Sequence, residues 1–143
     1  MMKLLDVNVL VQVHREDADL HGQMKGWLER ALEEPAGVAV SELVLSGFLR
    51  VVTHPKVFRE PSPLAVALDF AEDLRSREGV HILSAGRAHW RIFTDLCKRA
   101  DARGNHVPDA YHAALAVETG SEWLTLDRGF GRYPGLRWRQ PLD

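Results

Sequence analysis

Short apolar segments alternate with longer amphipathic segments along the whole chain, and this alternation limits the possible folds more than any other feature. The apolar segments have the length of strands, and the periodic apolar positions between them predict helices. Strands that are each followed by a helix form a sheet whose strands run mostly parallel. The sequence therefore predicts an α/β fold. We expect one domain over residues 1–143, because this length matches the usual size of a domain.

The expected strands are Lys3–Asp6, Val38–Val40, Val80–Leu83 and Glu122–Leu126, with a short final strand over Leu136–Arg139. The expected helices are Asn8–Arg15, Asp17–Glu34, Ser41–Val52, Ser62–Glu78, Gly86–Arg103 and Pro108–Gly120. Ser62 and Pro63 are typical of an N-cap and a first helical residue, and Gly104 is typical of a residue that ends a helix. Residues 53–61 are predicted to form a loop.

The charge and cysteine content exclude some classes of protein. A formal net charge of −2, from 18 basic and 20 acidic residues, argues against a simple basic nucleic-acid binder. The single cysteine, Cys97, cannot form an internal disulfide, which favours a reducing compartment. Asp6 and Asn8 interrupt the apolar N-terminus, so it does not resemble a signal peptide, and no apolar segment approaches the roughly 20 residues of a membrane span. We therefore expect a cytoplasmic protein without a membrane segment.

Four acidic side chains stand at the ends of predicted strands or in the first turns of predicted helices: Asp6, Glu42, Asp109 and Asp127. Ligands of open parallel sheets bind beyond the carboxyl ends of the strands, so we expect these side chains to converge there. Asp6 interrupts an apolar segment, where a buried charge needs a partner or a function. Glu42 and Asp109 have an alternative interpretation, because acidic residues in the first turn also stabilise a helix through its dipole.

Clustered carboxylates favour one kind of chemistry. Like charges a few ångströms apart repel each other, so such a cluster binds protons or cations. Mg²⁺ and Mn²⁺ prefer oxygen ligands, and a bound cation of this kind activates water and neutralises charge that develops on a phosphate. The four acids therefore predict a metal-dependent hydrolase that acts on phosphodiester bonds and needs no histidine base.

Four segments, in this order, resemble the motifs of the PIN-domain nucleases, and in particular those of the VapC toxins of bacterial toxin–antitoxin systems. They are Leu5–Leu10, Ser41–Pro55, Val107–Ala116 and Thr125–Phe130, and the C-terminus over Phe130–Leu142 is also similar. Each segment carries one of the four acids, and the resemblance covers essentially the whole chain. It implies a PIN-like three-layer α/β/α fold with a mostly parallel central sheet of four to five strands.

The resemblance also implies a function. It is that of an endoribonuclease toxin that uses Mg²⁺ or Mn²⁺, is neutralised by a VapB-type antitoxin and forms a homodimer. It assigns the metal to Asp6, Glu42, Asp109 and Asp127, and it assigns supporting hydrogen bonds to Asn8 and Thr125. One position departs from the pattern: many relatives have a further acid shortly after the fourth aspartate, whereas residue 129 is glycine. One potential ligand of a second metal is therefore missing.

Two groups of basic residues are candidate contacts for RNA or antitoxin. The first group follows Glu42 and consists of Arg50, His54, Lys56 and Arg59. The second group lies in the C-terminal segment, where Arg128, Arg132, Arg137 and Arg139 alternate with Phe130, Tyr133 and Trp138. Arginine and aromatic side chains suit phosphate contact and base stacking. The alternative is that these aromatics belong to the core and the arginines are solvated, and the sequence leaves both possibilities open.

Other residues have simpler interpretations. His112 shares a helix face with Asp109, but we expect it to pack or form a hydrogen bond rather than bind a metal. The apolar residues Leu43, Gly47, Phe48 and Val51 are expected in the core. Trp27, Trp90 and Phe58 exceed the need of a small core and suggest a surface for a partner or a dimer.

Two other functions are compatible with an acidic α/β chain. The first is a different Mg²⁺-dependent phosphohydrolase, which usually carries a second aspartate two residues after the first and a lysine near the site. Here residue 8 is asparagine, and no lysine has an obvious place. The second is a non-catalytic PIN-like binding module, against which the presence of all four acids argues.

Overall fold

The computed structural model describes residues 1–143 and contains one five-stranded sheet in which every strand is parallel to its neighbours. Its strands are β1 (Lys3–Leu5), β2 (Val38–Ser41), β3 (Val80–Leu83), β4 (Glu122–Leu124) and β5 (Trp138–Arg139). They lie side by side in the order β3-β2-β1-β4-β5. The predicted α/β class and the predicted number of strands are thus confirmed.

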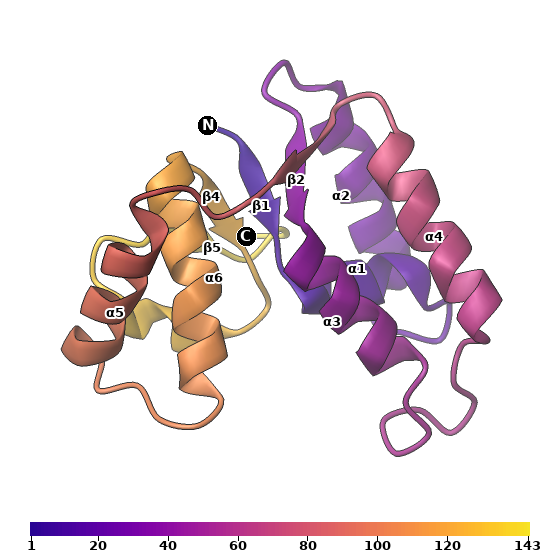
Figure 1. The fold of residues 1–143 in the computed structure, drawn as a ribbon. Helices are drawn as coiled ribbons and strands as arrows, with labels where there is room; N and C mark the ends of the chain where they lie inside the picture. The colour runs from indigo at the N-terminus through magenta and orange to yellow at the C-terminus, as the bar shows by residue number, and fades with distance from the viewer.

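Six α-helices and one short 3₁₀-helix surround the sheet. They are α1 (Val7–His14), α2 (His21–Glu33), α3 (Glu42–Val52), α4 (Leu64–Ser76), α5 (His89–Arg99), α6 (His106–Thr119) and the 3₁₀-helix η1 (Arg128–Arg132). Figure 1 shows α1 to α4 gathered on one side of the strands and α5 packed against α6 on the other. The arrangement is the expected three-layer α/β/α fold. None of the helices combines the length and the apolar character needed to cross a membrane.

The central strands are buried on both faces. Leu4 and Leu5 of β1, Val38 and Val40 of β2 and Leu124 of β4 have no exposed surface. Parallel strands that are covered by helices on both sides show continuous apolar segments rather than alternating ones, as these do. Burial on both faces fixes the positions of the strand ends, which is what the candidate site requires.

The carboxyl ends of β1 and β4 meet at the point where the strand order reverses. Leu5 is in register with Leu124, and the backbone N–H of Asp6 donates to the carbonyl of Leu124 at 3.0 Å. From β1 the chain continues to β2 and β3 on one side of the sheet, while β4 and β5 lie on the other. Such a switch point leaves a crevice beyond the strand ends, which is the usual ligand site of open α/β sheets.

Helices α2 and α5 begin several residues later than the sequence predicts. α2 begins at His21 rather than Asp17, because the Asp17 carboxylate binds the guanidinium of Arg15 and the Leu20 N–H donates to the side chain of Gln12. α5 begins at His89 rather than Gly86. The reason is that the carboxylate of Glu118 accepts the backbone N–H groups of Gly86 and Ala88, which holds this segment outside the helix.

Other predicted helix bounds are also wrong. α6 begins at His106 rather than at Pro108. α5 ends at Arg99, and Asp101 with a φ of 48° turns the chain there, so Gly104 is not its cap. α4 covers Leu64–Ser76, and Ser62 is not its N-cap, because the Ser62 hydroxyl contacts His14 and Arg15 instead. The end of α6 is as predicted, since Gly120 with a φ of 66° is its left-handed C-cap.

The turn between α2 and β2 yields a test of the packing. Gly37 has a φ of 66°, and a Cβ there would overlap the carbonyl oxygen of Gly79, which accepts the Val38 N–H at 2.9 Å. Gly37→Ala is expected to lower the free energy of unfolding by about 3 kcal/mol or more, because it adds a backbone clash to left-handed strain.

The matched control is Gly104→Ala. Gly104 has a similar φ of 56°, but a Cβ there meets no atom within 4 Å. This control should lose only about 1 kcal/mol, the cost of strain alone. Urea unfolding of both variants measures the difference, and equal losses would contradict the clash at Gly79.

Candidate active site

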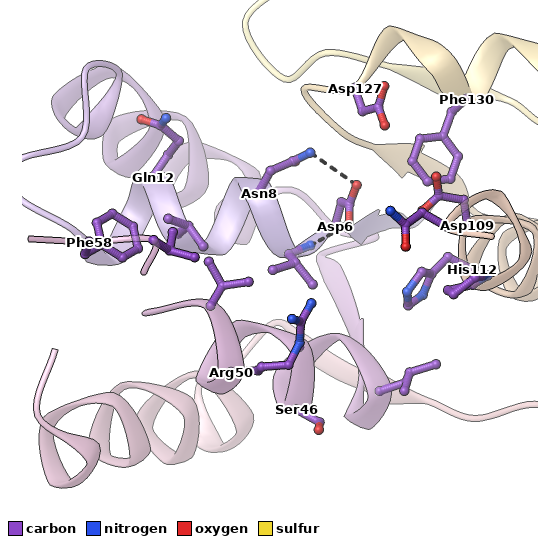
Figure 2. A pocket seen from close by; sticks show the side chains of 18 residues that line it. Asp6, Asn8, Gln12, Ser46, Arg50, Phe58, Asp109, His112, Asp127 and Phe130 are labelled. Carbon is purple, nitrogen blue, oxygen red and sulfur yellow. Dashed lines mark hydrogen bonds between the residues drawn. The ribbon is translucent and has the colours of Figure 1, made fainter. Parts of the chain in front are cut away.

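A groove with a volume of about 810 Å³ opens at the crevice between β1 and β4. Residues of α1, α3 and α6 line it, together with part of the loop after α3 and the start of η1. Figure 2 shows Asp6, Asp109 and Asp127 around one end of this groove. Three of the four predicted acids thus face a common space although they are far apart in the sequence.

Asp6 is held by hydrogen bonds on both carboxylate oxygens. Oδ1 accepts the backbone N–H of Val7 at 2.6 Å, which makes Asp6 the N-cap of α1. Oδ2 accepts the hydroxyl of Thr125 at 2.6 Å and the side-chain amide of Asn8 at 3.3 Å. Only 8% of Asp6 is exposed. Its carboxylate therefore has a fixed orientation at the mouth of the crevice.

Asn8 and Thr125 join the two strand ends. The Asn8 amide donates to Thr125 Oγ1 at 3.2 Å, and Asn8 Oδ1 accepts the backbone N–H of Leu126 at 3.1 Å. Thr125 Oγ1 also accepts the backbone N–H of Asp127 at 3.0 Å. The two residues to which the family resemblance assigns supporting hydrogen bonds thus make such bonds to Asp6 and to the segment that carries Asp127.

Asp127 and Asp109 are placed by the C-terminal segment and by α6. Asp127 caps η1, since its Oδ1 accepts the N–H of Gly129 at 2.8 Å. Asp109 is in the first turn of α6. The hydroxyl of Tyr133, at the end of η1, donates to the carbonyl of His106 at 2.7 Å and so fixes the start of α6 beside η1.

The three aspartates affect one another electrostatically. Burial raises the pKa of Asp6 to about 6; the hydrogen bonds from Thr125 and Val7 oppose this, and the negative charges of Asp109 and Asp127 add to it. Burial also raises the pKa of Asp109, and the charge of Asp127 raises it further. The groove therefore concentrates negative charge that a cation would stabilise.

Glu42 does not join these aspartates, contrary to the sequence-based expectation. It is the first residue of α3, but its side chain is 70% exposed, and it binds Arg75 of α4 at 2.9 Å rather than lining the groove. An arginine partner on the neighbouring helix thus holds this carboxylate outside the groove. No group of three or more Asp, Glu, His or Cys side chains is close enough together to form a complete metal site.

The face of α3 that was expected in the core is divided between core and groove. Phe48 has no exposed surface, but Leu43 is 49% exposed, and Leu43, Gly47 and Val51 line the groove. The prediction for these three residues is wrong because α3 packs on its neighbours through Val44, Leu45, Phe48 and Val52 instead. The apolar face of α3 is wider than its contact with the core. This excess width was the only feature of the sequence that indicated the groove-lining residues of α3.

The basic candidates fall in different places. Arg50 lines the groove from α3, whereas His54, Lys56 and Arg128 do not. His54 stabilises a local turn, because its Nδ1 accepts the backbone N–H of Lys56 at 3.1 Å. Burial raises the pKa of Asp109, and the positive charge of Arg132 opposes part of this rise, so Arg132 is close enough to act electrostatically on Asp109.

Gly129 lies close to two side chains of its own segment. A Cβ at this position would lie 2.9 Å from the guanidinium of Arg132 and 2.9 Å from Oδ1 of Asp127. Arg132 therefore lies beside the position at which the family resemblance leads us to expect a further acid. The alternation of arginines and aromatics in this segment is also explained, because Phe130 and Tyr133 are buried in the core and Arg128, Arg132 and Arg137 are exposed.

The remaining candidates are explained by packing or exposure. His112 lines the groove, but its ring stacks on Trp123 with a centroid distance of 5.4 Å, and burial lowers its pKa to about 4. Trp27 belongs to the core, whereas Trp90 on α5 is 68% exposed. Gln12, Ser46 and Asn105 also line the groove, and no pattern in the sequence had singled them out.

Comparison with known proteins supports the resemblance. The family model described as the PIN domain matches residues 3–136. Ribonuclease VapC43 of Mycobacterium tuberculosis is 42% identical over 142 residues, which are 99% of this chain and 97% of that protein.

Two solved structures share the fold at 17% sequence identity. One is VapBC2 from Rickettsia felis bound to a promoter DNA fragment; the match has a TM-score of 0.75 and covers 98% of both chains. The other is Mycobacterium tuberculosis VapC20, a sarcin-ricin loop cleaving toxin; the match has a TM-score of 0.64 and covers 90% of this chain and 92% of that one.

The raised pKa of Asp6 predicts how stability depends on pH in metal-free protein. The folded-state pKa of about 6 exceeds the ordinary value of 3.8, so the folded state binds more protons than the unfolded state between these values. The free energy of unfolding of the wild type, relative to Asp6→Asn, should therefore fall by about 3 kcal/mol as the pH rises through this interval. Urea unfolding at a series of pH values in EDTA measures this difference. A relative gain in stability with rising pH would contradict an environment dominated by burial.

Proposed function

This chain belongs to the PIN-domain family and, within it, to the VapC ribonucleases, and from this premise we propose that it is a Mg²⁺- or Mn²⁺-dependent endoribonuclease toxin. The observation that carries the proposal is the convergence of Asp6, Asp109 and Asp127 on one groove. Family membership indicates cleavage of RNA. The metal, the manner of cleavage and the partners are the parts that we propose.

The donor chemistry of the groove fits a hard divalent cation. Carboxylate oxygens are the ligands that Mg²⁺ and Mn²⁺ prefer, and Mg²⁺ is often held by one or two carboxylates together with water. Burial, and to a smaller extent the negative charges of Asp109 and Asp127, raise the pKa of Asp6. A bound cation would offset the unfavourable charge of the ionised carboxylate. We propose that these three aspartates hold the cation together with water, because they are not close enough together to form a complete metal site by themselves. Glu42 is left out, because its carboxylate binds Arg75.

When bound, such a cation supplies activated water and neutralises charge on the phosphate. The protein itself fixes the geometry. Thr125 and Asn8 orient the carboxylate of Asp6, and the bond between Tyr133 and His106 keeps Asp109 beside Asp127. Arg50 faces the same groove and can hold a neighbouring phosphate of the RNA. Arg132 lies next to Gly129 and adds positive charge there. A second cation would lack a carboxylate ligand at this position, because residue 129 is glycine.

The partners in the proposal are RNA, a VapB-like antitoxin and a second copy of the chain. VapBC assemblies are among the solved structures with this fold, which supports a VapB-like partner. The homodimer rests on the family resemblance alone. A short neighbouring gene for a DNA-binding antitoxin would be the genomic counterpart of this assignment.

Cleavage of RNA by purified protein tests the proposal. Wild-type protein should cleave RNA with Mg²⁺ or Mn²⁺ and not in EDTA. Asp6→Asn should reduce the rate at least about a hundredfold, because the loss of a cation's charge stabilisation costs several kcal/mol and each 1.36 kcal/mol is a factor of ten.

The matched control is Asp69→Asn, which removes the same charge from an exposed site on α4. It should cleave as fast as the wild type. Circular dichroism at the assay temperature checks that both variants are folded. If Asp6→Asn cleaves RNA at the wild-type rate, the assignment of the active site is wrong.

A further inference from the structure

The groove extends beyond the aspartates, and an aromatic ring stands at its other end. Figure 2 shows Phe58 at the end opposite to Asp109 and His112. Val57 and Phe58 come from the loop after α3, and Val11 and Val51 also line the groove, from α1 and α3. The ring and these valines are apolar, whereas the opposite end of the groove is acidic. The ring is therefore in a place where a ligand bound at the aspartates can reach it.

Arg15 fixes the ring of Phe58. Its guanidinium carbon lies 4.0 Å from the centre of the ring, and only 8% of Arg15 is exposed. The same guanidinium donates to the carbonyl of Glu60 at 2.7 Å and to both carboxylate oxygens of Asp17 at 2.9 and 2.6 Å. A buried charge is tolerated when it is paired in this way, and its contact with the ring is itself attractive. One face of Phe58 is thus covered by a cation that cannot easily move.

The end of the loop is anchored as well. The backbone N–H of Ser62 donates to the carbonyl of Val52 at 2.8 Å, and Arg15 donates to Ser62 Oγ at 3.2 Å. His14 Nε2 lies 3.0 Å from the same hydroxyl, and its ring packs against Phe48 and Phe70 at centroid distances of 5.3 and 4.9 Å. A loop with no helix or strand of its own therefore presents Phe58 in a preformed position.

Arg50 connects the two ends of the groove. Its side chain lines the groove from α3, and in Figure 2 it lies between Phe58 and Asp109. It takes part in none of the ion pairs of the chain. An unpaired guanidinium is a good ligand for a phosphate group. The groove thus combines an acidic end, a free cation and an aromatic end.

With the proposed function as its basis, we infer that Phe58 is the seat of an unpaired nucleobase of the RNA substrate. The base belongs to the same strand as the phosphate at the aspartates, and Arg50 contacts the backbone between them. A flat ring that is held from one side suits stacking, which tolerates any base because every base has a flat face. A volume of about 810 Å³ is within the range of pockets that enclose ligands. An apolar peptide side chain would match the aromatic end, but it would use neither Arg50 nor the aspartates.

Binding of RNA with Ca²⁺ in place of Mg²⁺ keeps a cation at the aspartates and tests whether a base stacks on Phe58. A control without protein and a check for intact RNA after each titration confirm that no cleavage occurs. A cleavage site of the wild-type protein is first mapped in total RNA. The probe is a short single-stranded RNA that contains this site. A series of further probes has the same sequence, and each of them lacks the base at one position. Fluorescence anisotropy gives the affinities. One abasic position near the cut should weaken binding by wild-type protein about tenfold, the size expected for a lost base–aromatic contact.

Two variants connect this position to Phe58. Phe58→Leu keeps an apolar side chain without the flat ring, so it should bind the intact RNA about tenfold more weakly and should no longer distinguish the abasic RNA. Phe58→Tyr keeps the ring and should retain both the affinity and the discrimination. The thermal midpoint of each variant shows whether it is folded.

Several results would contradict the inference that a nucleobase stacks on Phe58. One is an abasic series in which no position matters to the wild-type protein, a result that does not depend on any variant. Another is a folded Phe58→Leu variant with wild-type affinity and discrimination. A third is a Phe58→Leu variant that binds RNA normally but loses binding to a VapB-type antitoxin, which would assign the ring to a peptide. If wild-type protein neither binds nor cuts RNA, both the proposed function and the role of Phe58 are wrong. If it cuts RNA but binds every abasic RNA as tightly as the intact one, only the role of Phe58 is wrong.

Discussion

The hydrogen bond from the Thr125 hydroxyl to Oδ2 of Asp6, at 2.6 Å, is the interaction on which the candidate active site depends. It joins the carboxyl ends of β1 and β4 at the point where the strand order reverses. The same hydroxyl accepts the N–H of Asp127, so one side chain positions two of the three aspartates. Because Thr125 is fully buried, this bond is not in competition with water.

Negative charge at this crevice has a structural cost and a chemical use. Burial and like charges make Asp6 harder to ionise, and its bonds to Thr125 and Val7 recover only part of that cost. An uncompensated carboxylate cluster in a groove is a common feature of functional sites, because the charge that destabilises the free protein attracts a cation. The aromatic end of the groove carries no such cost, since the guanidinium of Arg15 that covers the ring of Phe58 is paired with Asp17. The groove thus has one end suited to a charged group and one suited to a flat apolar group.

The sequence predicted those features that depend on local pattern. The strands, the class of fold and three of the four acids at the groove follow from apolar segments and from acids placed at strand ends. Several of the errors come from contacts between distant residues. Glu42 binds Arg75 of another helix, Glu118 holds the segment before α5, and Ser62 is held by Arg15 rather than capping α4. Spacing along the chain contains no information on such partners, and the same holds for Phe58, whose position depends on a guanidinium 43 residues earlier in the chain.

The central claim is that Asp6, Asp109 and Asp127 together hold a divalent cation. Titration of Mn²⁺ into metal-free protein, followed by electron paramagnetic resonance of the free ion, tests it directly. The account predicts one tightly bound Mn²⁺ per chain, weaker binding as the pH falls below about 6, where Asp6 takes up a proton, and loss of this binding in Asp6→Asn. A protein that binds no Mn²⁺, or an Asp6→Asn variant that binds it as tightly as the wild type, would contradict the account.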